Sequence, residues 1–284
     1  MKRSTTILAS VISLALSSTS YAASSGKILI LLSGSTKLPL TQGQPMTTGY
    51  YLNEFGVPAD ALLKAGYTLQ IATPDGKVPQ ADPHSADTKY FGNSTQEMQR
   101  IQTMIAHLPG VETRYSIADA LKSDLSQYDG IFIPGGHAPL IDLANNPQVG
   151  QLLTWFHQHH KATAALCHGP ITLLSAQTDP KAYEAGMIAH KSIPADKWIY
   201  KGYQMTIFST PEEQAFEGSL KGAKLRYYPA DAMSQAGGKM NFGGMWQSHV
   251  VVDRELVTGQ NPSSANELAT QLIHLLQTQS KQGA

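Results

Sequence analysis

Short runs of aliphatic and β-branched residues alternate along the chain with longer segments whose apolar positions recur every three or four residues. The short runs predict buried strands and the longer segments predict amphipathic helices. The predicted strands are residues 27–32, 67–72, 130–134, 163–166, 203–208, 224–228 and 249–252. The predicted helices are residues 58–65, 96–108, 149–160, 171–176 and 262–277. This alternation is typical of an α/β fold with a mostly parallel sheet and helices on both of its faces.

The segment between the second and third predicted strands is longer than a simple crossover requires. It runs from about residue 78 to residue 128 and contains the predicted helix 96–108. Asn93, Ser94 and Thr95 precede that helix and are suitable N-caps. The same triplet matches a glycosylation acceptor, but capping explains it more simply. We predict that the segment forms a small cap insertion near the carboxyl edge of the sheet.

The first 22 residues differ from the rest of the chain. Lys2 and Arg3 precede a short apolar stretch, and Ser20-Tyr21-Ala22 follows as a cleavage site with small residues. This order predicts a signal peptide over residues 1–22 and a secreted or periplasmic protein. The apolar stretch is shorter than the roughly 20 residues of a membrane span. Residues 23–284 then form a single predicted domain.

The charge balance excludes some classes of partner. The chain has 21 Lys plus Arg and 21 Asp plus Glu, so its formal net charge is zero. A neutral chain has no electrostatic reason to bind nucleic acid or an anionic membrane. We therefore expect neither partner once the signal peptide is removed.

The chemistry of the chain centres on Cys167, which is its only cysteine. It follows the predicted strand 163–166 and precedes a predicted helix, with Ala165 and Gly169 as the small neighbours that a nucleophile elbow requires. A helix N-terminus and a protonated His168 would both favour the thiolate, so we expect a lowered pKa. The alternative is a buried structural cysteine, which is a common role for an unpaired cysteine.

Two further segments end near the same edge of the sheet. Gly135, Gly136 and His137 follow the strand 130–134, and Glu54 lies after the long loop that follows the first strand, before the helix predicted at 58. Sites in open parallel sheets lie at the carboxyl ends of strands. The backbone N–H groups of Gly136 and His168 are therefore candidates for binding an oxyanion.

Several ordered motifs together resemble the ThiJ/PfpI superfamily, and in particular its heat-shock chaperone and glyoxalase III branch. They span nearly all of residues 23–284. The motifs are Thr48-Gly49-Tyr50-Tyr51-Leu52-Asn53-Glu54, Ala65-Gly66-Tyr67, Thr73-Pro74-Asp75-Gly76, Ile133-Pro134-Gly135-Gly136-His137, Leu166-Cys167-His168-Gly169-Pro170 and Val257-Thr258-Gly259-Gln260-Asn261-Pro262.

The resemblance implies a flavodoxin-like sandwich, usually a homodimer, with Cys167 as nucleophile, His168 beside it and Glu54 hydrogen-bonded to the sulfur. Glu213 best matches the acidic residue that orients the histidine, and Glu212 remains an alternative. The implied activity is the conversion of methylglyoxal or a related 2-oxoaldehyde to a 2-hydroxy acid, without glutathione, a cofactor or a metal. Gly135 and Gly136 would contribute to the oxyanion site.

Three other functions remain open. A glutamine amidotransferase is disfavoured because its downstream histidine is followed two residues later by glutamate, whereas His249 is followed by two valines. A cysteine hydrolase or peptidase would use the same nucleophile and oxyanion groups. A stress chaperone would use Cys167 as a redox-sensitive thiol.

The remaining histidines and aromatic residues predict structural roles. His84 and His107 lack partners at ligand spacing, and the cluster His157, His159 and His160 fits a solvated helix end, so no metal site is predicted. Tyr50 and Tyr51 are expected at the border of the pocket because they lie near Glu54. Most members of one aromatic set are expected to pack in the fold. The set is Trp198, Tyr200, Tyr203, Phe242 and Trp246.

Overall fold

The structure is a computed structural model that describes residues 25–108, 111, 114–195 and 197–282. At its centre lies a six-stranded sheet with the order β4-β1-β5-β6-β10-β9. Its strands are β1 (Gly26–Leu31), β4 (Tyr67–Ala72), β5 (Gly130–Ile133), β6 (Ala162–Leu166), β9 (Val250–Asp253) and β10 (Leu256–Gly259). Neighbouring strands are parallel except β9 and β10, which are antiparallel. This topology confirms the predicted flavodoxin-like α/β fold.

Both faces of the central strands of the sheet are buried. In β1, Ile28 and Ile30 point into one hydrophobic core, whereas Leu29 and Leu31 point into the other. The pleat of a strand directs successive side chains to opposite faces, and covering both faces requires a continuous apolar run. All four side chains are fully buried. Each such burial stabilises the fold by about 1.5–3 kcal/mol.

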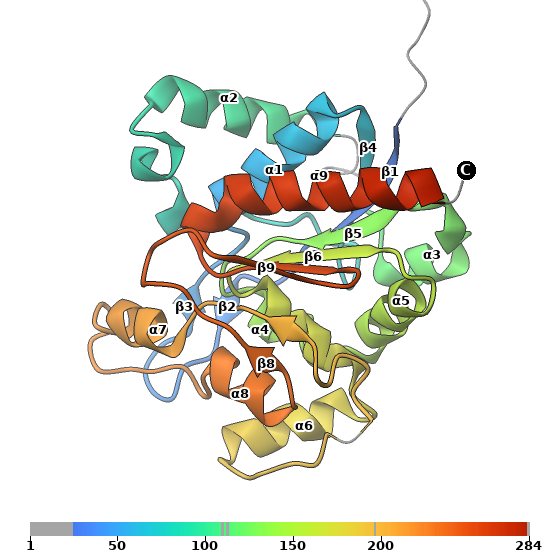
Figure 1. Ribbon diagram of the computed structural model, residues 1–284. Helices are drawn as coiled ribbons and strands as arrows, with labels where there is room; N and C mark the ends of the chain where they lie inside the picture. The colour runs from blue at the N-terminus through green and yellow to red at the C-terminus, as the bar shows by residue number, and fades with distance from the viewer. Residues whose placement is uncertain (1–24, 109–110, 112–113, 196, 283–284) are drawn as a thin grey trace, which may run out of the picture.

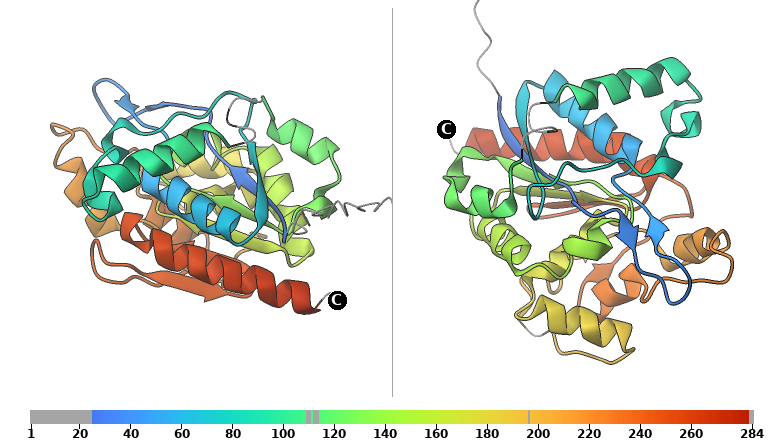
Figure 2. Two further views of the ribbon diagram at one scale, coloured as in Figure 1. Left: turned by 90° about the horizontal axis from the view of Figure 1, so that it is seen from above. Right: turned by 180° about the vertical axis from the view of Figure 1, so that it is seen from behind.

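Three long helices cover one face of the sheet. They are α1 (Leu52–Lys64), α2 (Thr95–Ala106) and α9 (Ala265–Gln282). Helix α1 contacts both α9 and α2, and it lies between them (Figure 1; Figure 2). Gly56 permits the close approach of α2, because a Cβ at this position would lie 2.2 Å from the Ile101 side chain. Ser94 caps α2 by accepting a hydrogen bond from the Glu97 N–H, so the predicted capping role is confirmed.

The opposite face carries helices that are mostly shorter. The helices there are α3 (Ile117–Lys122), α4 (Pro139–Asp142), α5 (Pro147–Gln158), a 3₁₀ helix (Gly169–Ala176), α6 (Pro180–Ile188) and α8 (Pro229–Gln235). Helix α7 (Thr210–Glu217) lies beside α8. Two small sheets complete the fold, β2 (Lys37–Leu38) with β3 (Met46–Thr47) and β7 (Gln204–Met205) with β8 (Lys239–Met240).

Several predicted elements differ from the structure. Helix α1 begins at Leu52, six residues before Pro58, so Glu54 lies in its first turn and not before it. Only Gln204–Met205 of the predicted strand 203–208 is a strand, and it belongs to a small separate sheet. The predicted strand 224–228 is wrong, because only Leu225 forms an isolated bridge, with Leu40. Strand β10 was not predicted.

The segment 78–128 divides between the two faces of the sheet. Helix α2 packs on α1, whereas α3 contacts α5. Its role as a cap over the site stays a prediction. The predicted signal peptide lies outside the described residues. Among the helices of the described ranges, none combines the length and apolar composition that crossing a membrane requires.

Candidate active site

The backbone turns sharply at Cys167, between β6 and the 3₁₀ helix. Cys167 has φ of 58°, in the left-handed region that non-glycine residues rarely adopt. Its N–H donates to the Gly259 carbonyl at 2.8 Å, and its carbonyl accepts from the Phe208 N–H at 2.9 Å. A Cβ on Gly169 would lie 2.3 Å from the Ile133 carbonyl oxygen, so a small residue is required there. These features confirm the predicted elbow, and such strain is typical of functional sites.

Glu54, Gly135 and Cys167 meet beside this turn. The start of α1 is held by the Tyr51 N–H, which donates to the Gly135 carbonyl at 3.1 Å. A Cβ built on Gly135 would lie 2.3 Å from Glu54 Oε2 and 2.6 Å from Cys167 Cβ. The carboxyl group and the cysteine therefore face each other across a glycine that has no side chain to separate them.

This close approach predicts the effect of adding one methyl group. In Gly135→Ala, the new Cβ would displace Glu54 or Cys167, because the Leu166 carbonyl oxygen lies only 2.5 Å away on a third side. We expect a loss of about 1–3 kcal/mol of stability from overpacking. We also expect slower alkylation of Cys167. Thermal unfolding and the rate of thiol alkylation measure the two effects. The control for surface substitution is Gly218→Ala, because Gly218 is exposed, has φ of −54°, and a Cβ there would meet only one atom within 4 Å, at 3.2 Å.

Glu54 is fully buried, and the hydrogen-bonding capacity of its carboxyl group is not satisfied by the described residues. Burial raises the pKa of Glu54 to about 8, while the Cys167 side chain and the Gly136 amide act in the opposite direction. Although these groups are close enough to affect the pKa, neither carboxyl oxygen has a partner in hydrogen-bond geometry among the described residues. At neutral pH the Glu54 carboxyl therefore carries a proton that it can donate to a bound molecule.

The Cys167 thiol is also protonated in the resting site. Burial, followed by the charge of Glu54, raises the pKa of Cys167 well above its ordinary value, and only the Gly136 amide among the main contributors lowers it. The expected thiolate is thus a wrong prediction. The pKa of His168 is lowered, first by burial and then by His137, so His168 does not supply the expected positive charge.

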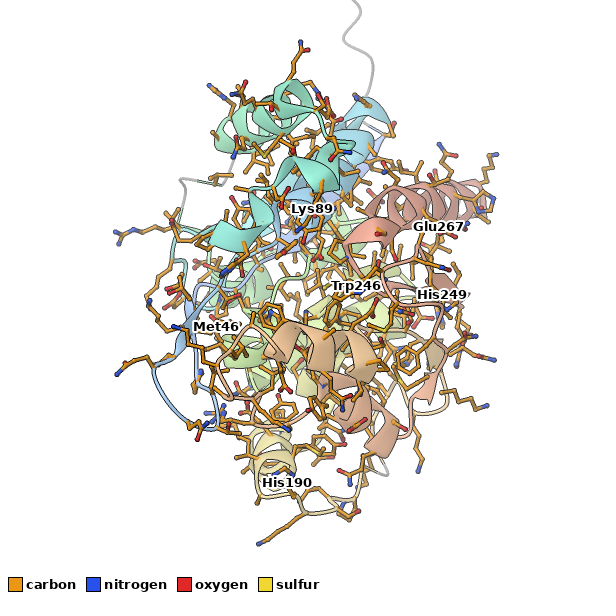
Figure 3. All side chains as sticks on the ribbon, turned by 90° about the vertical axis from the view of Figure 1, so that its left-hand side faces the viewer. Met46, Lys89, His190, Trp246, His249 and Glu267 are labelled. Atoms are coloured by element: carbon orange, nitrogen blue, oxygen red, sulfur yellow. The ribbon has the colours of Figure 1, made fainter. Side chains whose placement is uncertain are left out.

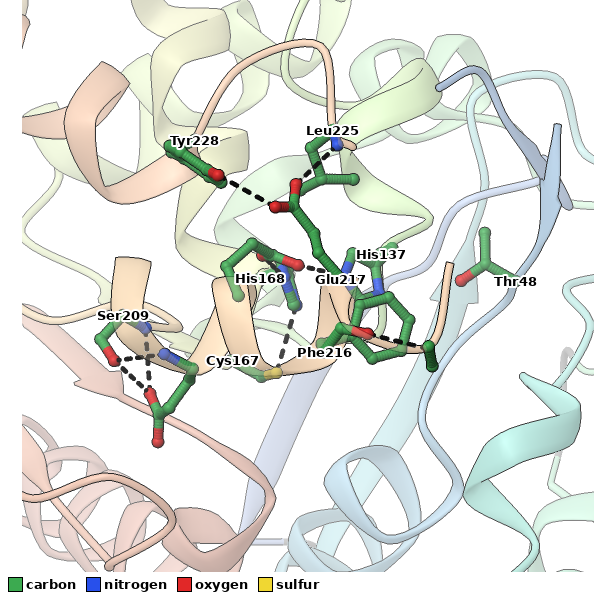
Figure 4. Close-up of polar contacts among 12 residues, drawn as sticks. Thr48, His137, Cys167, His168, Ser209, Phe216, Glu217, Leu225 and Tyr228 are labelled. Atoms are coloured by element: carbon green, nitrogen blue, oxygen red, sulfur yellow. Dashed lines mark hydrogen bonds and ion pairs between the residues drawn. The ribbon is translucent and has the colours of Figure 1, made fainter. Parts of the chain in front are cut away.

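His168 is the basic group closest to the sulfur. Its Nδ1 lies 3.3 Å from Cys167 Sγ (Figure 4), and its Nε2 lies 2.6 Å from Glu213 Oε2. The pKa of Glu213 is lowered, because the imidazoles of His137 and His168 outweigh the opposing effect of burial. A carboxylate can only accept, so His168 carries its proton on Nε2. Its Nδ1 is then free to accept the thiol proton.

Helix α7 distinguishes the two candidate acidic residues. Glu213 contacts His168 through one oxygen and His137 through the other, at 2.8 Å. Glu212 instead accepts hydrogen bonds from the Ser209 hydroxyl at 2.7 Å and the Trp246 N–H at 2.7 Å. The structure therefore places Glu213, and not Glu212, against His168. The link from Glu213 to His137 was not predicted, although His137 was noted beside the glycine pair.

The geometry of this site agrees with the comparison to known protein families. The model of the DJ-1/PfpI family matches residues 46–275. The chain belongs to the DJ-1/PfpI family. Among its curated relatives, the protein/nucleic acid deglycase HchA of Staphylococcus aureus strain Newman is 27% identical over 247 residues, which cover 85% of this chain and 77% of the relative.

Solved structures show the same fold. Glyoxalase III from Candida albicans has 22% identity and a TM-score of 0.67, with 88% of this chain and 97% of the other covered. The 24 kDa rapid encystment protein of Francisella tularensis has 22% identity and a TM-score of 0.67, with 88% and 99% covered. The predicted ThiJ/PfpI resemblance is thus confirmed at the level of the family and the fold.

In this DJ-1/PfpI protein, His137, His168 and Glu213 also form a group of three possible metal ligands, with ligand atoms within 4.8 Å of one another. A zinc ion would require each ligand atom at about 2.0–2.2 Å from the metal. The Glu213 oxygens are instead 2.8 and 2.6 Å from the two Nε2 atoms, which is hydrogen-bond spacing. The contacts therefore fit proton sharing between these side chains.

Four other residues that the sequence singled out make contacts of their own. His157 is not a solvated helix end, because its Nδ1 lies 2.8 Å from Glu255 Oε1. His249 Nε2 contacts Asn241 at 3.2 Å, whereas the imidazole beside the Cys167 sulfur is that of His168. The Tyr51 hydroxyl contacts that of Tyr90 at 3.0 Å. The Tyr50 ring packs on Phe55 at the start of α1, with ring centroids 5.2 Å apart.

The aromatic set that the sequence singled out packs mostly in the fold, as predicted. Trp198, Tyr200 and Tyr203 are buried, whereas Phe242 and Trp246 are exposed. The two exposed residues are the exceptions that a prediction for most of the set allows.

Proposed function

We propose that this DJ-1/PfpI protein is a glyoxalase III-like enzyme that converts methylglyoxal or a related 2-oxoaldehyde to a 2-hydroxy acid without glutathione. The observation that carries the proposal is the buried Glu54 carboxyl, which faces Cys167 across Gly135. It has no hydrogen-bond partner among the described residues, and its pKa is raised to about 8. An acid of this pKa can both donate and accept a proton near neutral pH. The names of the deglycase and glyoxalase III relatives support the same chemistry.

The first step is addition of the thiol to the aldehyde. The sulfur of Cys167 forms a bond to the aldehyde carbon, and its proton passes to His168 Nδ1, which lies 3.3 Å away. The carbonyl oxygen receives the proton of Glu54 as its π bond breaks. The products are a hemithioacetal, a protonated His168 and an ionised Glu54. The Gly136 amide, which faces the sulfur, is placed to bind the developing oxyanion.

The second step moves a proton between adjacent carbons. The Glu54 carboxylate removes the hydrogen of the aldehyde carbon, and the second carbonyl oxygen takes the proton held by His168 as the enediol forms. Glu54 then gives its proton to the second carbon and takes one from the hydroxyl on the first carbon. The product is a thioester of the 2-hydroxy acid on Cys167.

Hydrolysis closes the cycle. A water oxygen attacks the thioester carbonyl while His168 Nδ1 takes a proton from that water. The carbon–sulfur bond breaks, the sulfur regains the proton from His168, and the 2-hydroxy acid leaves. All three side chains return to their resting protonation states, so the cycle consumes only the aldehyde and water.

Glu213 acts in this scheme as a positioning residue for His168. In Glu213→Gln, the amide can present an N–H to His168 Nε2, which would move the imidazole proton to Nδ1 and remove the base beside the sulfur. We expect kcat/KM to fall by about 10²–10⁴-fold, as it does when a histidine is held in the wrong tautomer. Steady-state kinetics measures the fall in kcat/KM, and the alkylation rate of Cys167 should fall with it. An unchanged kcat/KM would remove Glu213 from the mechanism.

The experiment that tests the proposal is lactate formation from methylglyoxal by residues 23–284, without glutathione and under reducing conditions. Activity that Cys167→Ala abolishes supports the proposal. Absence of activity with a fully reduced thiol contradicts it. A cysteine hydrolase would use the same elbow but needs no proton transfer between carbons, so it would retain activity on ester substrates in Glu54→Gln.

We also propose that the protein is exported and acts as a homodimer. The basic start, apolar stretch and small-residue site in residues 1–22 support export, and the family resemblance supports the dimer. Mass spectrometry of the exported protein should find a new N-terminus after residue 22. Sedimentation of that protein should give twice the chain mass, and retention of residues 1–22 or a monomer would contradict the respective proposal.

A further inference from the structure

Three large apolar side chains are exposed on the loop between β8 and β9. Phe242, Met245 and Trp246 are 43%, 43% and 48% exposed. Single exposed apolar residues are normal on protein surfaces, but a local group of them marks an interaction site. Trp246 lies on the face of the molecule seen in Figure 3.

The backbone holds Trp246 in a strained position. Its φ is 60°, which is unfavourable for a bulky residue. Its N–H donates to Glu212 Oε1 at 2.7 Å, and its carbonyl accepts from the Ser263 hydroxyl at 2.8 Å. Strain of this kind costs about 1–3 kcal/mol and persists only where the surroundings impose it. The exposed indole is therefore positioned by hydrogen bonds on both sides of its residue.

Glu212 anchors this loop to the helix that also positions the catalytic histidine. Its carboxyl is fully buried and accepts hydrogen bonds from Gln260 Nε2 at 3.0 Å and Asn261 Nδ2 at 2.8 Å, besides those from Ser209 and Trp246. The next residue of α7 is Glu213. One turn of helix thus holds both His168 and the exposed indole in place.

Ring contacts connect the indole to the reacting groups. The ring centroids of Trp246 and Phe208 are 5.5 Å apart, and those of Phe208 and His168 are 4.6 Å apart. Cys167 is only 3% exposed and Glu54 is fully buried. The two carbonyl carbons of the substrate must reach these buried groups in the proposed mechanism, so a larger substituent on the second carbon would extend toward the surface beside the site.

We propose that Trp246 is a specificity-determining residue that binds the apolar substituent of a 2-oxoaldehyde, with an aromatic substituent preferred. This inference rests on the proposed function and names its substrate class. An indole face binds apolar and aromatic groups through contact area and ring stacking. Methylglyoxal carries only a methyl group and leaves the indole unused, whereas phenylglyoxal carries a phenyl ring.

The first test compares kcat/KM for phenylglyoxal and methylglyoxal in the wild-type protein and in Trp246→Ala. We expect a loss of about tenfold for phenylglyoxal, mainly through a higher KM, and a change of less than twofold for methylglyoxal. Trp246→Phe should restore most of the loss. Val252→Ala, on β9, removes another exposed apolar side chain (46% exposed) and is the matched control. Equal losses for both aldehydes would overturn the inference.

A binding measurement separates this inference from the proposed function. Mandelate and lactate are the 2-hydroxy acids that phenylglyoxal and methylglyoxal would give. In the Cys167→Ala protein, calorimetry should find that mandelate binds about tenfold more tightly than lactate, and adding Trp246→Ala should abolish that preference. If the wild-type protein turns over neither aldehyde, the proposed function fails, and this preference alone decides the inference. Equal binding of the two acids would reject it.

Discussion

Cys167→Ala is expected to lower kcat/KM for methylglyoxal by at least about 10³-fold. The sulfur forms the covalent intermediate, so its removal leaves Glu54 and His168 with no bound hemithioacetal to act on. Lactate formation measured with matched amounts of folded protein gives the result. A residual rate within tenfold of the wild-type rate would contradict nucleophilic catalysis.

Cys167→Ser provides the stricter control. Serine keeps a hydroxyl at the same strained turn, where φ is 58°, and it retains a hydrogen-bonding partner for His168. Because an alkoxide is much harder to form than a thiolate, Cys167→Ser should be nearly as inactive as Cys167→Ala. Similar melting temperatures for both variants and the wild-type protein would show that the lost rate comes from the sulfur and not from unfolding.

The strand predictions were correct where a buried segment also forms hydrogen bonds with a neighbouring strand. The segment 27–32 is apolar at successive positions because both faces of β1 are covered. The segment 224–228 failed for an instructive reason: Leu225 and Tyr227 are indeed buried, but an alternating pattern reports burial and not hydrogen bonding. Only one isolated bridge pairs that segment with another.

The start of α1 was misplaced because Pro58 was interpreted as a first-turn residue. Proline is favoured there, since its missing N–H costs nothing at a helix start. In the structure Pro58 lies inside the helix. Proline in the helix interior removes the hydrogen bond to the carbonyl four residues earlier, which is that of Glu54. The candidate acid therefore lies on a turn whose helical bonding is incomplete.

The residues of the site were largely predictable, but their protonation was not. The elbow around Cys167 is local and depends on small neighbours that the sequence shows. The choice between Glu212 and Glu213 depends on which face of α7 each occupies, because consecutive helix residues point about 100° apart. The pKa directions of Cys167 and His168 depend on burial by distant segments, which no local pattern contains.

Glu54→Gln is expected to abolish nearly all turnover while stabilising the fold at higher pH. Glutamine matches the size of glutamate but cannot exchange a proton, so kcat should fall by about 10²–10⁴-fold. The wild-type protein should itself lose kcat/KM as pH rises through about 8, because the first step needs the protonated carboxyl, whose pKa is about 8. Lactate formation between pH 6 and 9 tests both statements, and an unchanged rate in Glu54→Gln would exclude the proton transfer.

Although Glu54→Gln removes activity, it should make the folded protein more stable than the wild-type protein as pH rises. Burial raises the pKa of Glu54 from 4.5 to about 8 in the folded protein. Between these values the folded state holds a proton that the unfolded state releases, so a rise in pH favours unfolding. The protonated carboxyl thus contributes stability that is complete below pH 4.5 and is lost as pH rises through about 8.

Glutamine has no such titration, so the stability of Glu54→Gln relative to the wild-type protein should increase from pH 5 to pH 8. The increase is at most on the order of 4 kcal/mol, because each pKa unit corresponds to about 1.4 kcal/mol. Denaturant unfolding at several pH values measures this difference in stability. Both proteins contain the Cys167 thiol, so the comparison varies only the side chain at position 54. A difference that stays constant with pH would show that Glu54 is ionised in the folded protein. It would then lack the proton that the first step requires, so the same measurement tests the origin of the activity.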